Sequence, residues 1–413
     1  MFNKLGKILV FSGFLMCAGL FSSTHQLQAQ HDFSVDGSIY TLKLGSNGRL
    51  YAGGFFFIVD DVHTNSIAVW DGVNWSGLGN GLVGSVYSIA FDSEGNLYAG
   101  GDFAILNGEG EIITSSSIAV WDGISWSGLA DELHGVVRAL TFDLAGNLYA
   151  GGSFSIENSG AEIGNIAMWD GVSWSGLGGG VEGTINTIVF DLDGNLYVGG
   201  SFSIESGGNE ISNIAMWDGV SWNGLSDGVN DEVLTLAVDG TGDVYAGGRF
   251  TTAGETSALF VARWDGVSWS SLRGGINRPI HTLALDRNGD LYAVGQFDVG
   301  LSINRERVAR WDGKRWDMLG NTVESTALAL TIDSAGALYL GGHQFIMIDS
   351  PRELDPEELI EATEANNDMF ATAATAAIII IVVTATMTLL VMRQLKASRV
   401  TGMQGFPAPD SPN

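Results

Sequence analysis

The sequence predicts an all-β fold, a β-propeller of four-stranded antiparallel blades, and three regularities carry that prediction. The twelve tryptophans form six pairs with a constant spacing of five residues. A tyrosine followed after one residue by Gly-Gly or Val-Gly recurs seven times, at intervals of 47 to 51 residues. Glycine is abundant, with 58 residues against six prolines. A repeat period in this range is typical of propellers, which bury their strand edges by radial repetition.

The repeat covers residues 36 to 345. Its tyrosines are Tyr51, Tyr98, Tyr149, Tyr197, Tyr245, Tyr292 and Tyr339. Its tryptophan pairs are Trp70–Trp75, Trp121–Trp126, Trp169–Trp174, Trp217–Trp222, Trp264–Trp269 and Trp311–Trp316. The distance from a pair's second tryptophan to the next tyrosine is always 23 residues, whereas 16 to 20 residues separate the second glycine from the next tryptophan. Because surface loops tolerate insertion, we expect one variable loop per repeat.

The second repeat illustrates the four strands. Val86–Phe91 alternates and is rich in strand formers, and Asp92–Asn96 has the residues of a tight turn. Leu97–Ala99 is the second strand, and its following glycines allow a close backbone approach. Ile118–Trp121 is the third strand, and Trp126 opens the fourth. These elements predict one antiparallel blade.

Six repeats are complete, and a seventh is partial. It has two strands, Ala327–Ile332 and Ala337–Leu340, but no tryptophan pair. Seven blades are favoured, with Phe345–Ile348 helping the incomplete one, because each hairpin carries an apolar face that needs a neighbour. The alternative is a six-bladed ring that the spare hairpin closes.

The N-terminal flank, residues 1–30, has the features of a secretory signal peptide. Lys4 and Lys7 precede the apolar run Ile8–Leu20, and Ala29 fits a cleavage position. The single cysteine, Cys17, lies inside this segment. The expected mature chain therefore has no disulfide and no thiolate site, and its propeller domain spans residues 31–348.

The C-terminal flank predicts a membrane anchor. Residues 349–369 form an acidic juxtamembrane spacer, and residues 370–392 contain no charged residue, which is enough length for a transmembrane helix. The short tail 393–413 begins with Arg393, Lys396 and Arg399, and basic residues favour the cytoplasmic side. We therefore expect a single-pass type I protein with its propeller on the extracytoplasmic side. A buried core helix is the alternative for 370–392.

The charge distribution excludes one class of partner. The net charge is −28, which opposes binding to nucleic acid because that binding depends on phosphate neutralisation. Residues 50–248 contain 26 acidic residues and one base, Arg138. Residues 249–320 contain ten bases and eight acids. The ring is expected to have a long acidic arc and a short, slightly basic one.

Two repeated features have both a structural and a functional interpretation. Turns such as Asp191–Asn195 resemble calcium loops, but their glycine is fourth rather than sixth, so turn chemistry explains them. The tryptophan pairs could stack on sugars, but their fixed spacing in every full repeat favours packing within and between blades. No metal or cofactor is expected from either feature.

The candidate binding residues lie in two places. The longest variable connection, Leu106–Ser117, contains Asn107, Glu109 and Glu111 in an acidic, glycine-rich stretch. In the third strands, Val and Met give way to Arg263 and Arg310, which suggests an anion-binding edge. The structural alternative for these arginines is a packed stem whose head reaches water or a neighbouring carboxylate.

The repeat resembles the kelch and galactose-oxidase type of propeller repeat. Within that type it is most similar to the repeats of secreted bacterial proteins and of the ectodomains of fungal cortical polarity markers. Gly100–Gly101 and Gly151–Gly152 match the family's diglycine, Trp126 matches its tryptophan, and Trp121 replaces its tyrosine. The resemblance implies a binding scaffold. The oxidase copper ligands have no counterpart here, so that activity and that cofactor are not implied.

These observations favour a binding scaffold for a protein or glycan, acting through its variable loops. The alternative is a polysaccharide hydrolase or lyase with a site at the propeller axis. The six histidines are scattered and form no metal-binding or catalytic motif. A cluster of carboxylates at the axis would favour the enzyme, and an open loop face would favour the scaffold. The sequence defines neither the partner nor the oligomeric state.

Overall fold

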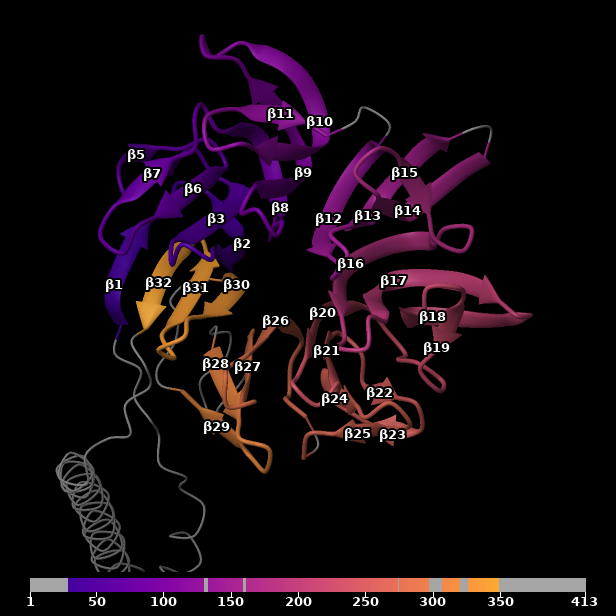
Figure 1. Ribbon diagram of the computed structural model, residues 1–413. Coiled ribbons are helices and arrows are strands. Elements are labelled where there is room, and N and C mark those ends of the chain that lie inside the picture. The colour runs from indigo at the N-terminus through magenta and orange to yellow at the C-terminus, as the bar shows by residue number, and fades with distance from the viewer. Residues whose placement is uncertain are drawn as a thin grey trace, which may run out of the picture. The chain divides into compact units, whose positions relative to one another are not determined.

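The computed structural model describes residues 29–129, 133–158, 161–273, 275–296, 307–319 and 326–348, all within one compact unit. Every regular element in these ranges is a β-strand. Seven four-stranded antiparallel sheets stand around a central axis, which confirms the prediction of seven blades (Figure 1). The first strand of each blade lies innermost and contacts the first strands of both neighbouring blades.

The blades follow the chain in order. Blade 1 is β2 (Ser38–Leu44), β3 (Leu50–Phe55), β6 (Ile67–Trp70) and β7 (Trp75–Gly77). Blade 2 is β8 (Leu82–Phe91), β9 (Leu97–Leu106), β10 (Ile112–Trp121) and β11 (Trp126–Gly128). Blade 3 is β12 (Leu133–Phe142), β13 (Leu148–Asn158), β14 (Ala161–Trp169) and β15 (Trp174–Gly176). Blade 4 is β16 (Glu182–Phe190), β17 (Leu196–Ser206), β18 (Asn209–Trp217) and β19 (Trp222–Gly224).

Blade 5 is β20 (Val233–Val238), β21 (Val244–Gly248), β24 (Val261–Trp264) and β25 (Trp269–Ser271). Blade 6 is β26 (Ile280–Leu285), β27 (Leu291–Gly295), β28 (Arg307–Trp311) and β29 (Trp316–Met318). Blade 7 is β30 (Ala327–Ile332), β31 (Leu338–Gly342), β32 (Gln344–Ile348) and β1 (Ala29–Ser34). Two small hairpins complete the set, β4 (Ile58–Val59) with β5 (Val62–His63) and β22 (Thr252–Ala253) with β23 (Thr256–Ser257).

Blade 7 is closed by the N-terminal strand. β1 pairs antiparallel with β32 in a register that sets Phe33 opposite Phe345, so strands from the two ends of the propeller share one sheet. The sequence analysis missed β1, because it has neither the tryptophan spacing nor the diglycine. The expected signal-peptide boundary at residue 30 falls inside this strand, and residues 1–28 lie outside the described part.

Aromatic packing replaces the missing tryptophan pair at this junction. The Phe33 ring lies 6.3 Å from both Trp70 and Trp75 of blade 1 and 5.8 Å from Phe345. Trp75 meets Phe345 edge to face at 5.0 Å. Such aromatic contacts contribute beyond the area they bury. The closure is therefore held by packing as well as by strand pairing.

Each of the two positions of the diglycine requires glycine for a different reason. A Cβ on Gly100 would lie 2.8 Å from Cγ1 of Val137 in the next blade, so this glycine sets the distance between blades. A Cβ on Gly101 would lie 2.0 Å from the carbonyl oxygen of Ser85 on the adjacent strand. The expected close backbone approach is confirmed, and a side chain at either site meets a packed neighbour.

The tryptophan pairs are structural, as the sequence analysis favoured. Trp121 and Trp126 are cross-strand partners with ring centroids 5.4 Å apart. The Trp126 Nε1–H donates a hydrogen bond of 2.9 Å to the carbonyl oxygen of Leu78 in the preceding blade. The equivalent bonds are Trp222 to Leu177 (3.2 Å), Trp269 to Leu225 (2.8 Å) and Trp316 to Leu272 (3.1 Å). Each of these four pairs therefore joins two blades.

The aspartate turns are held by their own backbone. In blade 4, Asp191 Oδ1 accepts the N–H groups of Asp193 (3.0 Å) and Asn195 (2.8 Å), and its Oδ2 accepts the Asn195 side-chain amide. The carboxylate oxygens are thus engaged within the turn, which confirms the turn interpretation.

The described residues contain no helix that is long and apolar enough to span a bilayer. The spacer 349–369, the expected span 370–392 and the tail 393–413 all lie outside those residues.

Candidate partner-binding face

The antiparallel order gives each blade two different ends. The turns between strands 1 and 2 and between strands 3 and 4, such as Asp92–Asn96 and Asp122–Ser125, lie at one end, which we call the turn face. The connections between strands 2 and 3 and those between blades lie at the other end, which we call the hairpin face. Examples there are residues 107–111 and 178–181.

Three neighbouring blades extend their hairpins at the hairpin face. Strand pairing continues to Leu106↔Ile112 in blade 2, Asn158↔Ala161 in blade 3 and Ser206↔Asn209 in blade 4. These hairpins project outward from the ring (Figure 1). The expected loop over Leu106–Ser117 is wrong in this respect, since β9 and β10 occupy most of it and leave a turn at residues 107–111. The inserted length lengthens a hairpin and does not form an irregular loop.

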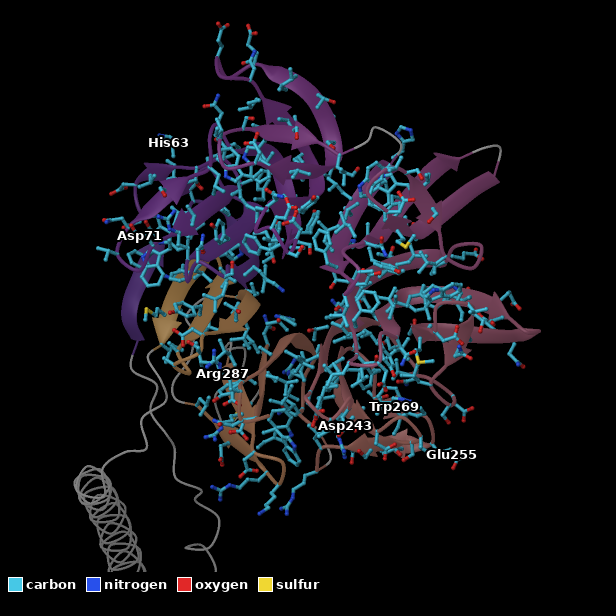
Figure 2. All side chains as sticks on the ribbon, in the orientation of Figure 1. His63, Asp71, Asp243, Glu255, Trp269 and Arg287 are labelled. Carbon is cyan, nitrogen blue, oxygen red and sulfur yellow. The ribbon has the colours of Figure 1, made fainter. Side chains whose placement is uncertain are left out.

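The corresponding connections of blades 1 and 5 are built differently. Each contains a separate two-stranded hairpin, β4–β5 or β22–β23. His63 on β5 and Glu255 beside β23 lie at the outer rim of the ring (Figure 2). Among the connections that the structure describes, the long hairpins of blades 2 to 4 are therefore confined to one side of the ring.

The predicted residues of blade 2 have unequal roles. Asn107 Oδ1 accepts the N–H groups of Glu109 (3.0 Å) and Glu111 (2.9 Å), and Asn107 Nδ2 donates to Glu111 Oε2 at 3.2 Å. Asn107 thus organises the turn. Glu109 and Glu111 are exposed, and the adjoining Ile112 is 65% exposed. The tip presents acidic and apolar groups together.

A cavity of about 750 Å³ lies between blades 3 and 4 on the same face, and the sequence analysis missed it. Its lining residues are His134, Ser153, Phe154, Ser155, Gly164, Asn165, Gly178, Gly179, Gly180, Val181, Glu182, Ser203, Ile204 and Glu205. The stretch Gly178–Gly180 has positive φ at all three positions, which glycine adopts without strain. Residues from two different blades form the cavity, so no spacing within one repeat reveals it.

Asn165 fixes the shape of this cavity. Its φ is 72°, and its Oδ1 accepts the Phe154 N–H at 2.8 Å while its Nδ2 donates to the Val181 carbonyl at 2.8 Å. The Val181 N–H in turn donates to the Gly164 carbonyl at 3.1 Å. A single side chain therefore links β13 to the connection that enters blade 4. This arrangement preorganises the cavity wall.

The cavity chemistry suits a polar or cationic group. His134, Glu182 and Glu205 are exposed, and serine hydroxyls lie between them. The lining contains two carboxylates and no lysine or arginine. Among the described residues, no group of three or more His, Cys, Asp and Glu side chains is arranged to hold a metal ion.

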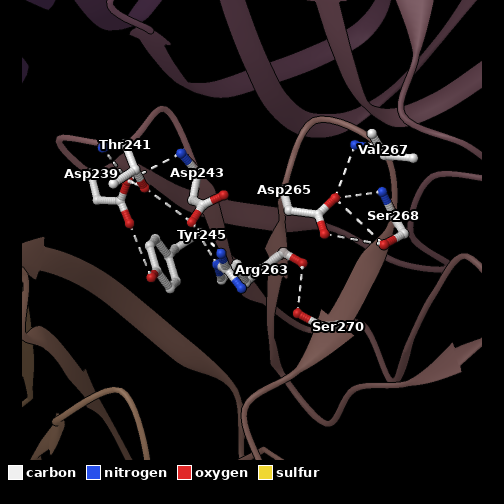
Figure 3. Close-up of polar contacts among 9 residues, drawn as sticks. All are labelled: Asp239, Thr241, Asp243, Tyr245, Arg263, Asp265, Val267, Ser268 and Ser270. Atoms are coloured by element: carbon white, nitrogen blue, oxygen red, sulfur yellow. Dashed lines mark hydrogen bonds and ion pairs between the residues drawn. The ribbon is translucent and has the colours of Figure 1, made fainter.

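The two predicted arginines lie at the turn face. Arg263 Nε donates to Asp243 Oδ2 at 2.8 Å (Figure 3). Arg310 Nε makes the equivalent 2.8 Å bond to Asp290 in blade 6. The hydrogen bond to Asp243 raises the pKa of Arg263. Each arginine head is thus paired with a neighbouring carboxylate, as the structural alternative in the sequence analysis expected. Arg263 and Arg310 therefore lie at the opposite end of the blades from Asn107, Glu109 and Glu111.

The innermost strands carry a second feature that the sequence analysis missed. In blade 2 the register skips Tyr87, because Val86 pairs with Gly101 and Ser88 pairs with Gly100. Every blade has this β-bulge at the equivalent position. The bulge residues are Tyr40, Tyr87, Arg138, Asn186, Leu234, His281 and Leu328. Bulges re-aim side chains and are frequent next to functional sites.

These positions lie at the hairpin end of the innermost strands, and we call the circle that they form around the axis of the ring the channel mouth (Figure 1). The available signal was chemical variety, since this position changes character between repeats while its flanking residues stay small or β-branched. Tyr40 and Tyr87 stack with centroids 5.3 Å apart and planes 14° apart. The Arg138 guanidinium carbon lies 5.4 Å from the centroid of the Tyr87 ring. The bulges thus form a contact network across blades 1 to 3.

The fold is a seven-bladed β-propeller. No protein-family model and no curated protein matches the sequence. Among solved structures, the extracellular domain of a putative one component system from B. thetaiotaomicron is 16% identical at a TM-score of 0.51, covering 78% of this chain and 40% of that chain. The chain thus spans less than half of that protein.

Two further structures have the same fold. YCF48 bound to D1 peptide is 12% identical at a TM-score of 0.50, covering 81% of this chain and 100% of that chain. PorZ of Porphyromonas gingivalis, a bacterial surface component of the type-IX secretion system, is 15% identical at a TM-score of 0.50 and covers 81% of this chain and 49% of that chain. At these identities the likeness concerns the fold alone, and the kelch type of repeat stays a prediction.

Proposed function

We propose that this chain is a membrane-anchored, extracytoplasmic propeller that binds a protein partner through the hairpin face of blades 2 to 4. One observation carries the proposal: three adjacent extended hairpins and a preorganised cavity of about 750 Å³ occupy the same side of one face. Concave sites with a few convergent polar groups are the usual places for ligands. Projecting hairpins beside such a site add contact area for a macromolecule.

Charge supports a partner with a basic surface. Glu109 and Glu111 at the blade 2 tip and Glu182 and Glu205 at the cavity are exposed carboxylates, and the lining has no lysine or arginine to pair with them. Complementary charge speeds association and disfavours partners of the wrong sign. Hydroxyls of the cavity also suit a glycan, so a glycan partner is an outcome that the experiment below distinguishes.

The proposed location rests on the flanks and on the similar structures. Two of those structures are an extracellular domain and a bacterial surface component. β32 ends at Ile348, opposite Leu338, which begins β31 directly after the turn at the turn face. The described part of the chain therefore ends at the turn face, at the opposite end of the blades from the hairpin face. YCF48 with its D1 peptide is a propeller of the same fold in a peptide complex.

The enzyme alternative is not proposed, because no observation favours it. The seven bulge positions at the channel mouth contain no carboxylate. Glu232, which lies beside the mouth, is engaged by Arg249 at 3.0 Å and by Asn186 at 3.0 Å.

The test uses the full-length protein at the surface of its own cells, with crosslinking and identification of the captured partner. One variant replaces residues 107–111 with the Gly-Gly turn that closes β17–β18, and another is Glu182→Gln with Glu205→Gln. Both should lose the partner, while the turn-face control Val172→Ser keeps it. Loss in the control with retention in both hairpin-face variants refutes the proposal. Release by glycosidase treatment and not by protease identifies a glycan.

A further inference from the structure

Arg138 differs from Arg249, Arg263 and Arg310 in its surroundings. It is the single base among residues 50–248, in a stretch with 26 acidic residues. Arg249, Arg263 and Arg310 each form an ion pair with a carboxylate. Within the part of the chain that the structure describes, Arg138 has no ion pair and instead lies over the Tyr87 ring. Its charge is therefore not neutralised despite the acidic surroundings.

The position of Arg138 follows from its backbone. It is the bulge residue of β12, between Val137, which pairs with Gly152, and Ala139, which pairs with Gly151. The side chain is exposed, whereas both neighbours are buried. The guanidinium contacts Tyr87 of blade 2, which stacks on Tyr40 of blade 1. Because a cation over an aromatic face is held in orientation, its N–H groups remain free at the edge.

We propose that Arg138 anchors a carboxylate of an extended peptide segment of the partner, with Tyr40 and Tyr87 as the adjoining stacking surface. This inference rests on the proposed function, because it names the chemistry that the partner presents at the channel mouth. A planar guanidinium binds a carboxylate through two parallel hydrogen bonds. The site thus differs from the cavity between blades 3 and 4, which lacks a cation.

A peptide fits this mouth better than an acidic polysaccharide does. Around the ring the bulge side chains change from aromatic to cationic, amide, aliphatic and imidazole. Half-exposed Leu234 and Leu328 offer apolar contacts that a uronate chain does not use. The net charge of −28 repels a polyanion, whereas a single carboxylate flanked by neutral or basic side chains can approach Arg138.

The test measures binding of two labelled pools of short acetylated and amidated peptides to the full-length protein in nanodiscs. Their flanking positions are randomised, and the central residue is Asp in one pool and Asn in the other. The Asp pool should bind at least about tenfold more tightly than the Asn pool. Arg138→Gln should abolish this difference, and Arg138→Lys should restore only part of it, because lysine keeps the charge but loses the paired hydrogen bonds.

Arg49→Gln is the matched control, since Arg49 is an exposed arginine beside the first turn of the turn face. It should leave the difference between the pools unchanged. Equal binding of the two pools, no binding of either, or an Asp preference that survives in Arg138→Gln overturns the inference. Arg138-dependent binding of oligogalacturonate with no peptide binding also overturns it. If partner capture still depends on the hairpins while the pools fail, the proposed function stands without this anchor.

Discussion

Val294 of blade 6 and Ala327 of blade 7 pack in one core cluster. At the equivalent position, every other pair of neighbouring blades sets a glycine of one blade against a valine or isoleucine of the next. Gly100 meets Val137 in this way, and Gly199 meets Val233. Between blades 6 and 7 the larger residue lies on the first blade of the pair and not on the second, so the side-chain volume between the blades stays similar. Both Val294 and Ala327 are buried.

This exchange predicts a coupled pair of mutations. Val294→Gly leaves a cavity and a flexible backbone, which should cost about 2–4 kcal/mol of unfolding free energy. Ala327→Val overpacks the same space and should cost about 1–3 kcal/mol. The double variant recreates the arrangement of the other blades and should recover most of both losses. Urea unfolding of the four proteins checks this, and additive losses contradict it.

The closure of blade 7 gives a second prediction. Phe33→Ala removes a ring that contacts Trp70, Trp75 and Phe345, so it should lower the free energy of unfolding by about 2–4 kcal/mol. Deleting β1 exposes the edge of β32 and should also promote aggregation. Phe57→Ala, at an exposed phenylalanine, is the control and should change little. Thermal unfolding followed by light scattering tests both effects. If deleting β1 changes neither the unfolding temperature nor the scattering, β1 does not close the ring.

The repeat made most of this architecture predictable. Blade number, the tryptophan pairing and the turn chemistry depend on residues that recur, so a single sequence reveals them. β1 occurs once and has an irregular pattern, and it became clear only from its pairing with β32.

The functional features were harder to predict for a related reason. The cavity is made by residues of two blades, His134 and Glu205 among them, which no spacing within a repeat brings together. The bulge at Tyr87 adds one residue to the strand and shifts the alternation of buried and exposed side chains, but no residue type marks its position in the sequence. Variation between repeats, in length at 107–111 and in chemistry at the bulges, was the informative signal.

Alkaline pH should destabilise the propeller through its repeat tyrosines. Burial first, and a nearby turn aspartate second, raise the pKa of Tyr197 and Tyr245 to about 12, and burial raises that of Tyr292 to about 12. Since the folded pKa exceeds the unfolded value of 10.0, their contribution is complete below pH 10 and is lost between pH 10 and about 12.

Absorbance of tyrosinate during a pH titration, measured together with unfolding, checks this prediction. Tyr245→Phe removes one titrating group and its hydrogen bond to Asp239, so the alkaline loss should become smaller. A variant whose alkaline transition matches the wild type would exclude a contribution from this residue.

Asn165 offers the most direct separation of cavity shape from overall stability. Its side chain makes two 2.8 Å bonds from a backbone with φ 72°, so replacing it changes both hydrogen bonding and backbone preference. Asn165→Gly tolerates the positive φ and loses only the bonds, whereas Asn165→Ala loses the bonds and strains the backbone. Asn165→Gly should cost about 1–3 kcal/mol of unfolding free energy, from the unpaired Phe154 N–H and Val181 carbonyl, and Asn165→Ala about 1 kcal/mol more.

Asn213, which makes the equivalent bond to Val229 in blade 4 from φ 64°, supplies the control. Asn213→Gly should be similarly destabilising but should leave partner binding intact, because Asn213 does not line the cavity. If both glycine variants weaken partner binding equally, the loss reflects stability and the cavity is not the binding site. If only Asn165→Gly weakens it, the wall that Asn165 holds between blades 3 and 4 is part of the partner contact.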